Sequence, residues 1–284
     1  MLNETELKEK LQALAQNEFQ PSGQDNLSEL IPAMLNHIGS TDSALRDELI
    51  YSAFGAWILR YNALSPDELR SLLPIVLDGQ HMLYKLGEQD TDSVFTRSFS
   101  ILVLPLLLIT HRSRPLFPAS EIDQIKKQLL YYLENERDRR GFVRQKGWAH
   151  AIAHTADALD DLARCTEMNK SDLVEILEGI RKAICVESAC YVDLEEERMV
   201  TAVIAILGRN LVPAAEVIQW MEGFSDLTLT IKSGPERHHI RANVKNFLQS
   251  LYFRLQWEGT PNNLDTPINR TLRKINPFAA QEGG

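Results

Sequence analysis

Residues Gly147–Arg164 read GWAHAIAHTADALDDLAR, and their pattern predicts an amphipathic helix with one polar face. His150, His154, Asp157 and Asp161 recur at helical spacing, and at about 100° per residue their side chains fall within roughly 60° of one another. Apolar side chains take the opposite face: Trp148, Ile152, Leu159 and Leu162. A helix that lines one side with two imidazoles and two carboxylates is either a polar surface or the wall of a site.

Helical periodicity continues along most of the chain. Ser65-Pro66-Asp67-Glu68 is a typical helix start, with an N-cap serine, a proline in the first turn and acidic residues near the positive end of the helix dipole. The other segments with this periodicity are residues 4–17, 26–38, 43–61, 92–111, 120–137, 171–186, 194–209, 213–224 and 237–257. Because the connections are short and no segment alternates with a period of two, we predict an all-α protein.

Four polar residues near the starts of long helices suggest an internal repeat. Arg46, Arg97, His150 and Arg198 follow one another at intervals of about 50 residues, the length of two antiparallel helices. We therefore predict a single all-helical domain over residues 1–257, in which antiparallel helix pairs stack as a HEAT-like α-solenoid. Residues 258–284 form a partly irregular C-terminal tail. A compact multi-helix bundle is the alternative.

The charge of the chain restricts its partners. The 284 residues carry a formal net charge of −9 at pH 7, which argues against wholesale binding to nucleic acid. Residues 231–284 are locally basic, with eight Lys and Arg against four Asp and Glu, and Lys232–Lys245 is the most concentrated basic stretch. An anionic ligand or nucleic acid could use this stretch. We favour the more ordinary roles of helix capping and pairing with acidic residues.

Three features predict a cytoplasmic protein. Cys165, Cys185 and Cys190 lack the spacing of a metal site and are interpreted as reduced thiols. The N-terminus is acidic and polar, unlike a secretory leader. The longest apolar run, Ile101–Ile109, is less than half of the roughly 20 residues that a membrane span needs, and Pro105 interrupts it. We therefore predict a core helix there and no membrane span.

Four segments together resemble a known family. They are LRDELIYSAFGAWI (Leu45–Ile58), SVFTRSFSILVL (Ser93–Leu104), RGFVRQKGWAHAIAHTADALDDLA (Arg140–Ala163) and NFLQSLYFRL (Asn246–Leu255). They are similar to the bacterial family catalogued as domain of unknown function 2785, and the third segment is the most specific. The resemblance implies an all-helical intracellular bacterial protein without an established activity. Some members are labelled membrane proteins, which the interruption at Pro105 argues against.

His150, His154 and Asp157 have a spacing at which two imidazole nitrogens and a carboxylate can share a divalent metal such as zinc. Zinc would need a further ligand, and the other imidazoles considered for it are those of His111, His238 and His239. The more ordinary interpretation is hydrogen bonding between helices, because H-x-x-x-H occurs often by chance. We therefore predict no cofactor, and a divalent metal is the alternative.

No complete catalytic motif is present in the sequence. There is no G-x-S-x-G and no glycine-rich phosphate loop, and Asp160-Asp161 lacks the second acidic motif of a magnesium pyrophosphate site. We predict a non-enzymatic binding module whose polar concave groove accepts a protein, a peptide or a small polar ligand. The predicted groove residues are His150, His154, Asp157, Asp161 and Arg198. A divalent-metal-dependent hydrolase that uses His150, His154 and Asp157 is the alternative.

Overall fold

A computed structural model describes residues 2–22, 26–230, 234–258 and 264–279 of the chain. These residues are mostly helical, with one two-stranded hairpin, which confirms the predicted all-α class. The chain forms two compact units, Met1–Glu167 and Met168–Gly284. The prediction of a single domain over residues 1–257 stays a prediction, because two compact units of one chain can still fold together.

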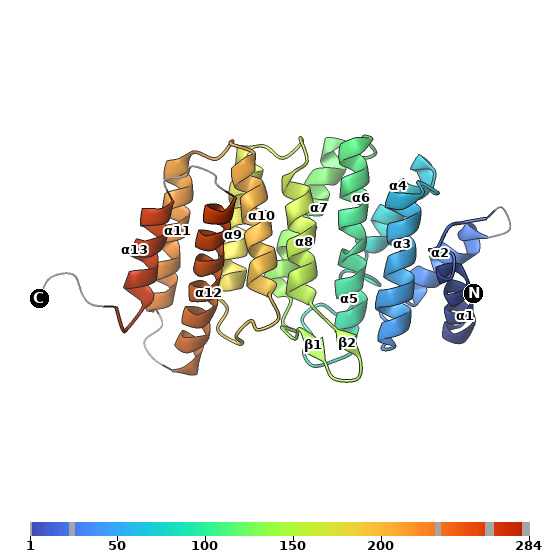
Figure 1. The fold of residues 1–284 in the computed structure, drawn as a ribbon, viewed down its shortest axis with the longest axis horizontal. Helices are drawn as coiled ribbons and strands as arrows, with labels where there is room; N and C mark the ends of the chain where they lie inside the picture. The colour runs from blue at the N-terminus through green and yellow to red at the C-terminus, as the bar shows by residue number, and fades with distance from the viewer. Residues whose placement is uncertain (1, 23–25, 231–233, 259–263, 280–284) are drawn as a thin grey trace, which may run out of the picture. The chain divides into compact units, whose positions relative to one another are not determined.

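The first unit contains the helices α1 to α8 and the hairpin (Figure 1). Its elements are α1 (Glu4–Ala15), α2 (Leu27–Asn36), the π-helical η1 (Ala44–Tyr51), α3 (Ser52–Gly55), the π-helical η2 (Ala56–Arg60), α4 (Pro66–Val76), α5 (Ser93–Ile101), α6 (Val103–Ser113), α7 (Ala119–Asn135), β1 (Phe142–Val143), β2 (Gly147–Trp148) and α8 (Ala151–Ala163). The predicted helix start at Ser65 is confirmed, because its hydroxyl accepts a hydrogen bond from the Glu68 backbone N–H and the Glu68 carboxylate accepts one from the Ser65 backbone N–H.

The apolar run of the sequence lies in α5 and α6. By length and composition, Ser93–Ser113 could cross a membrane. Its most apolar stretch of 18 residues has a mean hydropathy of 1.8, but 89 % of that stretch is buried inside the protein. α8 packs against α5, α6 and α7. Burial of this extent is typical of a core helix.

The helix predicted over residues 147–164 begins later than its periodicity indicates. Gly147 and Trp148 form β2, which pairs antiparallel with β1, and Phe142 lies opposite Trp148. Gly147 has φ +79° and His150 has φ +46°, and neither angle fits the interior of a right-handed helix. The predicted helix start at Gly147 and the predicted lack of strands are therefore wrong, and α8 begins at Ala151.

Two arginines of the predicted repeat are buried rather than exposed on a groove. Arg46 and Arg97 are both 0 % exposed. Arg97 donates hydrogen bonds from Nε and Nη2 to the Glu136 carboxylate, at 2.7 and 3.0 Å, and from Nη1 to the backbone carbonyl of Tyr84 at 3.1 Å. A buried guanidinium is tolerated only when its donors are satisfied. Arg97 therefore ties α5 to the chain after α7 and to the loop before α5.

The second unit contains α9 (Lys170–Ile184), α10 (Glu195–Gly208), α11 (Ala214–Thr230), α12 (Pro235–Trp257) and α13 (Asp265–Ile275). α10 packs against α12, and α13 packs against α11 and α12. α13 lies within the C-terminal segment predicted to be partly irregular. Its buried residues recur at helical spacing and attach it to the unit: Pro267, Ile268, Thr271 and Ile275.

Candidate binding surface

The hairpin β1–β2 lies at one end of the helices of the first unit (Figure 1). Two contacts hold it against η1. The Arg46 Nη2 donates hydrogen bonds to the backbone carbonyls of Lys146, at 2.8 Å, and Trp148, at 3.2 Å. Gly147 packs so closely that an added Cβ would lie 2.7 Å from the Ser43 Cβ. The hairpin is therefore a fixed part of the unit, although it contains only four strand residues.

Further contacts hold the side chain of Arg46. Its Nη1 donates a hydrogen bond to the Ser40 carbonyl at 2.6 Å, and its Nε lies 2.9 Å from the Asp47 carboxylate. The guanidinium carbon lies 4.3 Å from the ring centroid of Phe95 and 4.6 Å from that of Phe99. Burial lowers the pKa of the Arg46 guanidinium and the Asp47 carboxylate opposes this shift, but an arginine stays charged in proteins.

The hairpin presents two aromatic side chains to solvent. Phe142 is 56 % exposed and Trp148 is 40 % exposed. Their ring centroids lie 5.0 Å apart with an interplanar angle of 75°, a favourable edge-to-face arrangement. The His150 ring stacks on Trp148, with centroids 4.2 Å apart and an angle of 20°. The three rings form one cluster, which we call the aromatic cluster.

His150 links the hairpin to α8 in a strained conformation. Its φ of +46° lies in the left-handed region, which costs a residue other than glycine about 1 kcal/mol or more. Its backbone carbonyl accepts the first helical hydrogen bond of α8, from the His154 N–H at 2.9 Å. Strain of this kind persists where the surrounding structure imposes it, and it is frequent at binding and catalytic sites.

His154 lies one turn further along α8 and is 5 % exposed. Its Nδ1 lies 3.2 Å from the Ser98 carbonyl oxygen, so this nitrogen carries the proton and donates the hydrogen bond. The His154 ring contacts Phe99 edge to face at 5.0 Å and lies 5.8 Å from the His150 ring. The structure therefore brings the two predicted histidines together, but as part of a packed face of α8.

The predicted aspartates of α8 have different surroundings. Asp157 is half-buried, whereas the Asp161 carboxylate lies 2.8 Å from the Arg112 guanidinium and is 13 % exposed. Burial raises the pKa of the Asp161 carboxyl, although Arg112 opposes this shift. Asp161 is thus paired within the unit. Arg198, the fifth predicted groove residue, is half-buried on α10 of the second unit.

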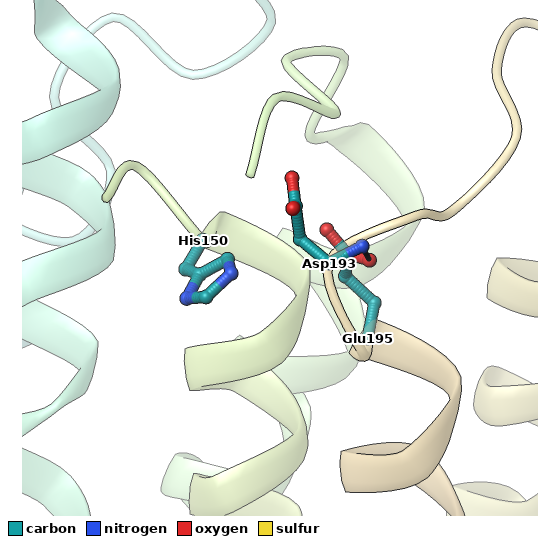
Figure 2. A group of neighbouring side chains, drawn as sticks. All are labelled: His150, Asp193 and Glu195. Atoms are coloured by element: carbon teal, nitrogen blue, oxygen red, sulfur yellow. Dashed lines mark hydrogen bonds between the residues drawn. The ribbon is translucent and has the colours of Figure 1, made fainter. Parts of the chain in front are cut away.

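Figure 2 draws His150 at the start of α8 and Asp193 and Glu195 at the start of α10. His150 belongs to the first unit, and the two carboxylates belong to the second. Within the second unit the Glu195 carboxylate accepts a hydrogen bond from the Asp193 backbone N–H at 2.9 Å. Burial raises the pKa of the Glu195 carboxyl, and its hydrogen bonds to backbone N–H groups oppose this shift. Glu195 thus closes the turn that leads into α10.

The other imidazoles considered as zinc ligands make structural contacts or lie at the surface. His111 Nδ1 accepts hydrogen bonds from the backbone N–H groups of Leu116 and Phe117, at 3.0 and 3.2 Å, and Nε2 lies 3.2 Å from the Glu167 carboxylate. His239 Nδ1 lies 2.7 Å from the Glu187 carbonyl oxygen. These contacts give His111 a role in closing the loop after α6. His238 is exposed, and the metal set of His150, His154 and Asp157 stays a prediction.

The three cysteines are free thiols. Burial raises the pKa of Cys165 and of Cys185 to about 12, so neither forms the thiolate that a nucleophile requires. Burial also raises the pKa of the more exposed Cys190. The environments of Cys165 and Cys185 are those of structural thiols, whereas Cys190 is exposed.

Sequence reasoning missed the aromatic cluster as a surface. Phe142 and Trp148 stand six residues apart, and the helical periodicity places Trp148 on the apolar face of a helix. A local signal existed, because Gly141 and Gly147 bracket a short segment with aromatic and β-branched residues, which is typical of a hairpin. The helical periodicity after residue 147 concealed it.

The model of the family described as "Protein of unknown function (DUF2785)" matches residues 82–253. The match spans more than half of the chain, so the chain belongs to this family, as its sequence segments suggest. The hairpin and α8 lie inside the matched range, whereas α13 lies outside it. No curated protein and no solved structure matches the chain.

Proposed function

We propose that the protein is a non-enzymatic binding module and that the aromatic cluster at the hairpin is its contact surface. One observation carries this proposal: Phe142 and Trp148 are exposed, yet the buried Arg46 holds the backbone of the strand that contains Trp148, with which Phe142 pairs. Rigid, partly exposed aromatic side chains supply contact area at a low cost in conformational entropy. Tryptophan is also enriched among residues that dominate binding energies.

The charge around the cluster favours an acidic partner segment. Five basic residues stand near the aromatic residues in the sequence, against the two acids Glu136 and Asp138: Arg137, Arg139, Arg140, Arg144 and Lys146. Arg140 pairs with Asp138, with Nε 2.8 Å from Oδ1, and Lys146 pairs with Asp92 at 2.7 Å. Arg144 is exposed in the turn between the strands. The partner is therefore proposed to be a peptide segment with acidic residues beside an apolar anchor.

Selection from a random-peptide library tests this proposal. Parallel selections use the wild type, the Phe142→Ala/Trp148→Ala double variant and the control Tyr131→Ala, which removes another exposed aromatic side chain of the same unit. We expect acidic peptides with an apolar anchor to bind the wild type and the control alike, and to lose about tenfold or more in affinity for the double variant. Peptides that bind all three proteins equally would contradict the proposal.

The finer prediction of stacked helix pairs with a polar groove remains part of this proposal. The groove would be lined by His150, His154, Asp157, Asp161 and Arg198, and the solenoid would have a radius of gyration above that of a compact chain. Small-angle scattering tests this prediction directly. A value near roughly 19 Å, the expectation for a compact chain of this length, would favour the alternative bundle.

A metal-dependent hydrolase is a second candidate function, and one observation favours it. His154 donates its Nδ1–H to the Ser98 carbonyl, which leaves Nε2 as the ring nitrogen with the lone pair. Backbone carbonyls orient metal-binding histidines in this way. His150 and Asp157 would then complete the ligand set, and elemental analysis tests it.

A further inference from the structure

The second unit contains a cleft of about 1170 Å³ on the side where α12 begins and α13 ends. Five cationic side chains line it: Arg237, Arg241, Arg270, Arg273 and Lys274. Asn269 and Asn276 add polar groups, and Leu229 and Ile275 add apolar surface. Its volume lies somewhat above the range of about 300–1000 Å³ that is usual for small-molecule sites.

The sequence spacing explains how the cations gather in one place. Arg237 and Arg241 stand four residues apart on α12, so they project from the same face of that helix. On α13, two further cations follow Arg270 at intervals of three and four residues, so all three side chains project from one face of that helix: Arg270, Arg273 and Lys274. Because α12 and α13 pack against each other, the two basic faces border one cleft.

Helix stability accounts for only part of this charge. Arg273 and Lys274 lie in the last turn of α13, where a cation is favourable with respect to the helix dipole. Arg237 lies in the first turn of α12, where the dipole disfavours a cation, and Arg241 lies one turn further along, where the dipole has little effect. A role in helix capping therefore does not explain the two α12 arginines.

The described residues show different partners for the cations of the cleft. Arg270 forms an ion pair with Glu222 of α11, at 3.0 Å. In the part of the chain that the structure describes, no carboxylate pairs with Arg241 or Lys274, and the buried Nε of Arg241 has no hydrogen-bond partner. A buried donor of this kind is costly unless something accepts its hydrogen bond. The positive charge of the cleft is opposite in sign to the net charge of the protein.

We propose that the cleft binds a small molecule with two or more linked phosphate groups. Four of the five cations are arginines, whose planar guanidinium groups match phosphate oxygens in a bidentate manner. The cations come from two helices, so a ligand that meets both sets must carry several negative charges within a short length. Linked phosphates do so, and the exposed side chain of Leu229 offers apolar contact to an uncharged part of the ligand.

Isothermal titration calorimetry of the full chain with inorganic tripolyphosphate tests the proposal. We expect one saturable site per chain and an affinity at least about tenfold higher than for orthophosphate. The Arg241→Gln/Lys274→Gln variant should lose about tenfold or more. The control Lys10→Gln/Lys127→Gln removes the same charge from exposed positions in the first unit and should change the affinity less than about twofold.

Two further variants distinguish binding in the cleft from effects of net charge and of unfolding. Arg241→Lys keeps the charge but removes the bidentate fork, so an intermediate affinity is expected. Lys274→Gln alters only an exposed residue and should weaken binding without unfolding the unit, as circular dichroism can verify. Equal affinities of the cleft and control variants, or no saturable binding, would overturn the proposal. Tighter binding of citrate or of a single-stranded oligonucleotide than of tripolyphosphate would also overturn it.

Discussion

The guanidinium of Arg46 donates a hydrogen bond to the backbone carbonyl of Trp148, with 3.2 Å between Nη2 and the oxygen, across 102 residues of sequence. The same nitrogen bonds the Lys146 carbonyl. One buried side chain of η1 thus fixes the strand from which the Trp148 ring reaches solvent. This long-range contact connects the interior of the first unit to the proposed contact surface.

Replacing Arg46 should therefore release the hairpin. Arg46→Met keeps much of the apolar volume but leaves the carbonyls of Ser40, Lys146 and Trp148 without their donor. We expect the free energy of unfolding to fall by roughly 3 kcal/mol or more, as measured by urea denaturation. The exposed control Arg60→Met should cost less than about 1 kcal/mol. Equal losses for the two variants would mean that Arg46 does not hold the hairpin.

Gly147 offers a second test of the contact between the hairpin and the start of η1. In Gly147→Ala the new Cβ would meet the Ser43 Cβ at 2.7 Å, at a backbone φ of +79°. We expect a destabilisation of roughly 2 kcal/mol. Gly55→Ala is the matched control, because nothing lies within 4 Å of its added Cβ and the residue is helical. That control should be neutral or stabilising by about 0.5–1 kcal/mol. A tolerated Gly147→Ala would contradict the observed packing.

Local signals predicted the helices of this protein well. The cap at Ser65 and the periodicity of residues 120–137 depend on neighbours within one or two turns, and the structure has helices there. The hairpin depends instead on Arg46, about a hundred residues away. No local pattern carries that contact, and the helical periodicity of α8 conceals the weaker hairpin signal between Gly141 and Gly147.

The candidate site could be predicted only in part, because sequence spacing indicates neighbours along one helix but not contacts with other elements. The spacing of His150 and His154 predicted that their rings lie close together, and the structure places them so. It could not predict the left-handed conformation of His150 or its stacking on Trp148. Nor could it predict that Asp161 is paired with Arg112, since this partner lies on another helix.

The pH dependence of stability offers a test at Asp161. Burial raises the pKa of its carboxyl above the ordinary value of 3.8, against the opposing effect of Arg112. A raised pKa in the folded state means that the contribution of this group to stability is fully present below pH 3.8. It is lost as the pH rises through the folded-state value.

We therefore expect the stability difference between the wild type and Asp161→Asn to shift in favour of the variant as the pH rises above 3.8. Thermal denaturation at a series of pH values measures this difference. A difference that instead grows in favour of the wild type would show that the ion pair with Arg112 outweighs burial.

Metal content separates the two candidate functions. The binding-module proposal predicts less than about a tenth of a divalent ion per chain in protein purified without a histidine tag, as measured by elemental analysis. About one zinc ion per chain would support the hydrolase instead. In that case His154→Gln should abolish the metal, whereas His81→Gln, which removes the histidine beside Asp78, should retain it.

Amide hydrogen exchange in the presence of a selected acidic peptide tests the central claim most directly. The account predicts that the peptide slows exchange within residues 142–150 of the wild type, and that the Phe142→Ala/Trp148→Ala variant loses this protection. The Tyr131→Ala control should keep it. Protection confined to other helices, with residues 142–150 exchanging as in the free protein, would contradict the assignment of the hairpin as the contact surface.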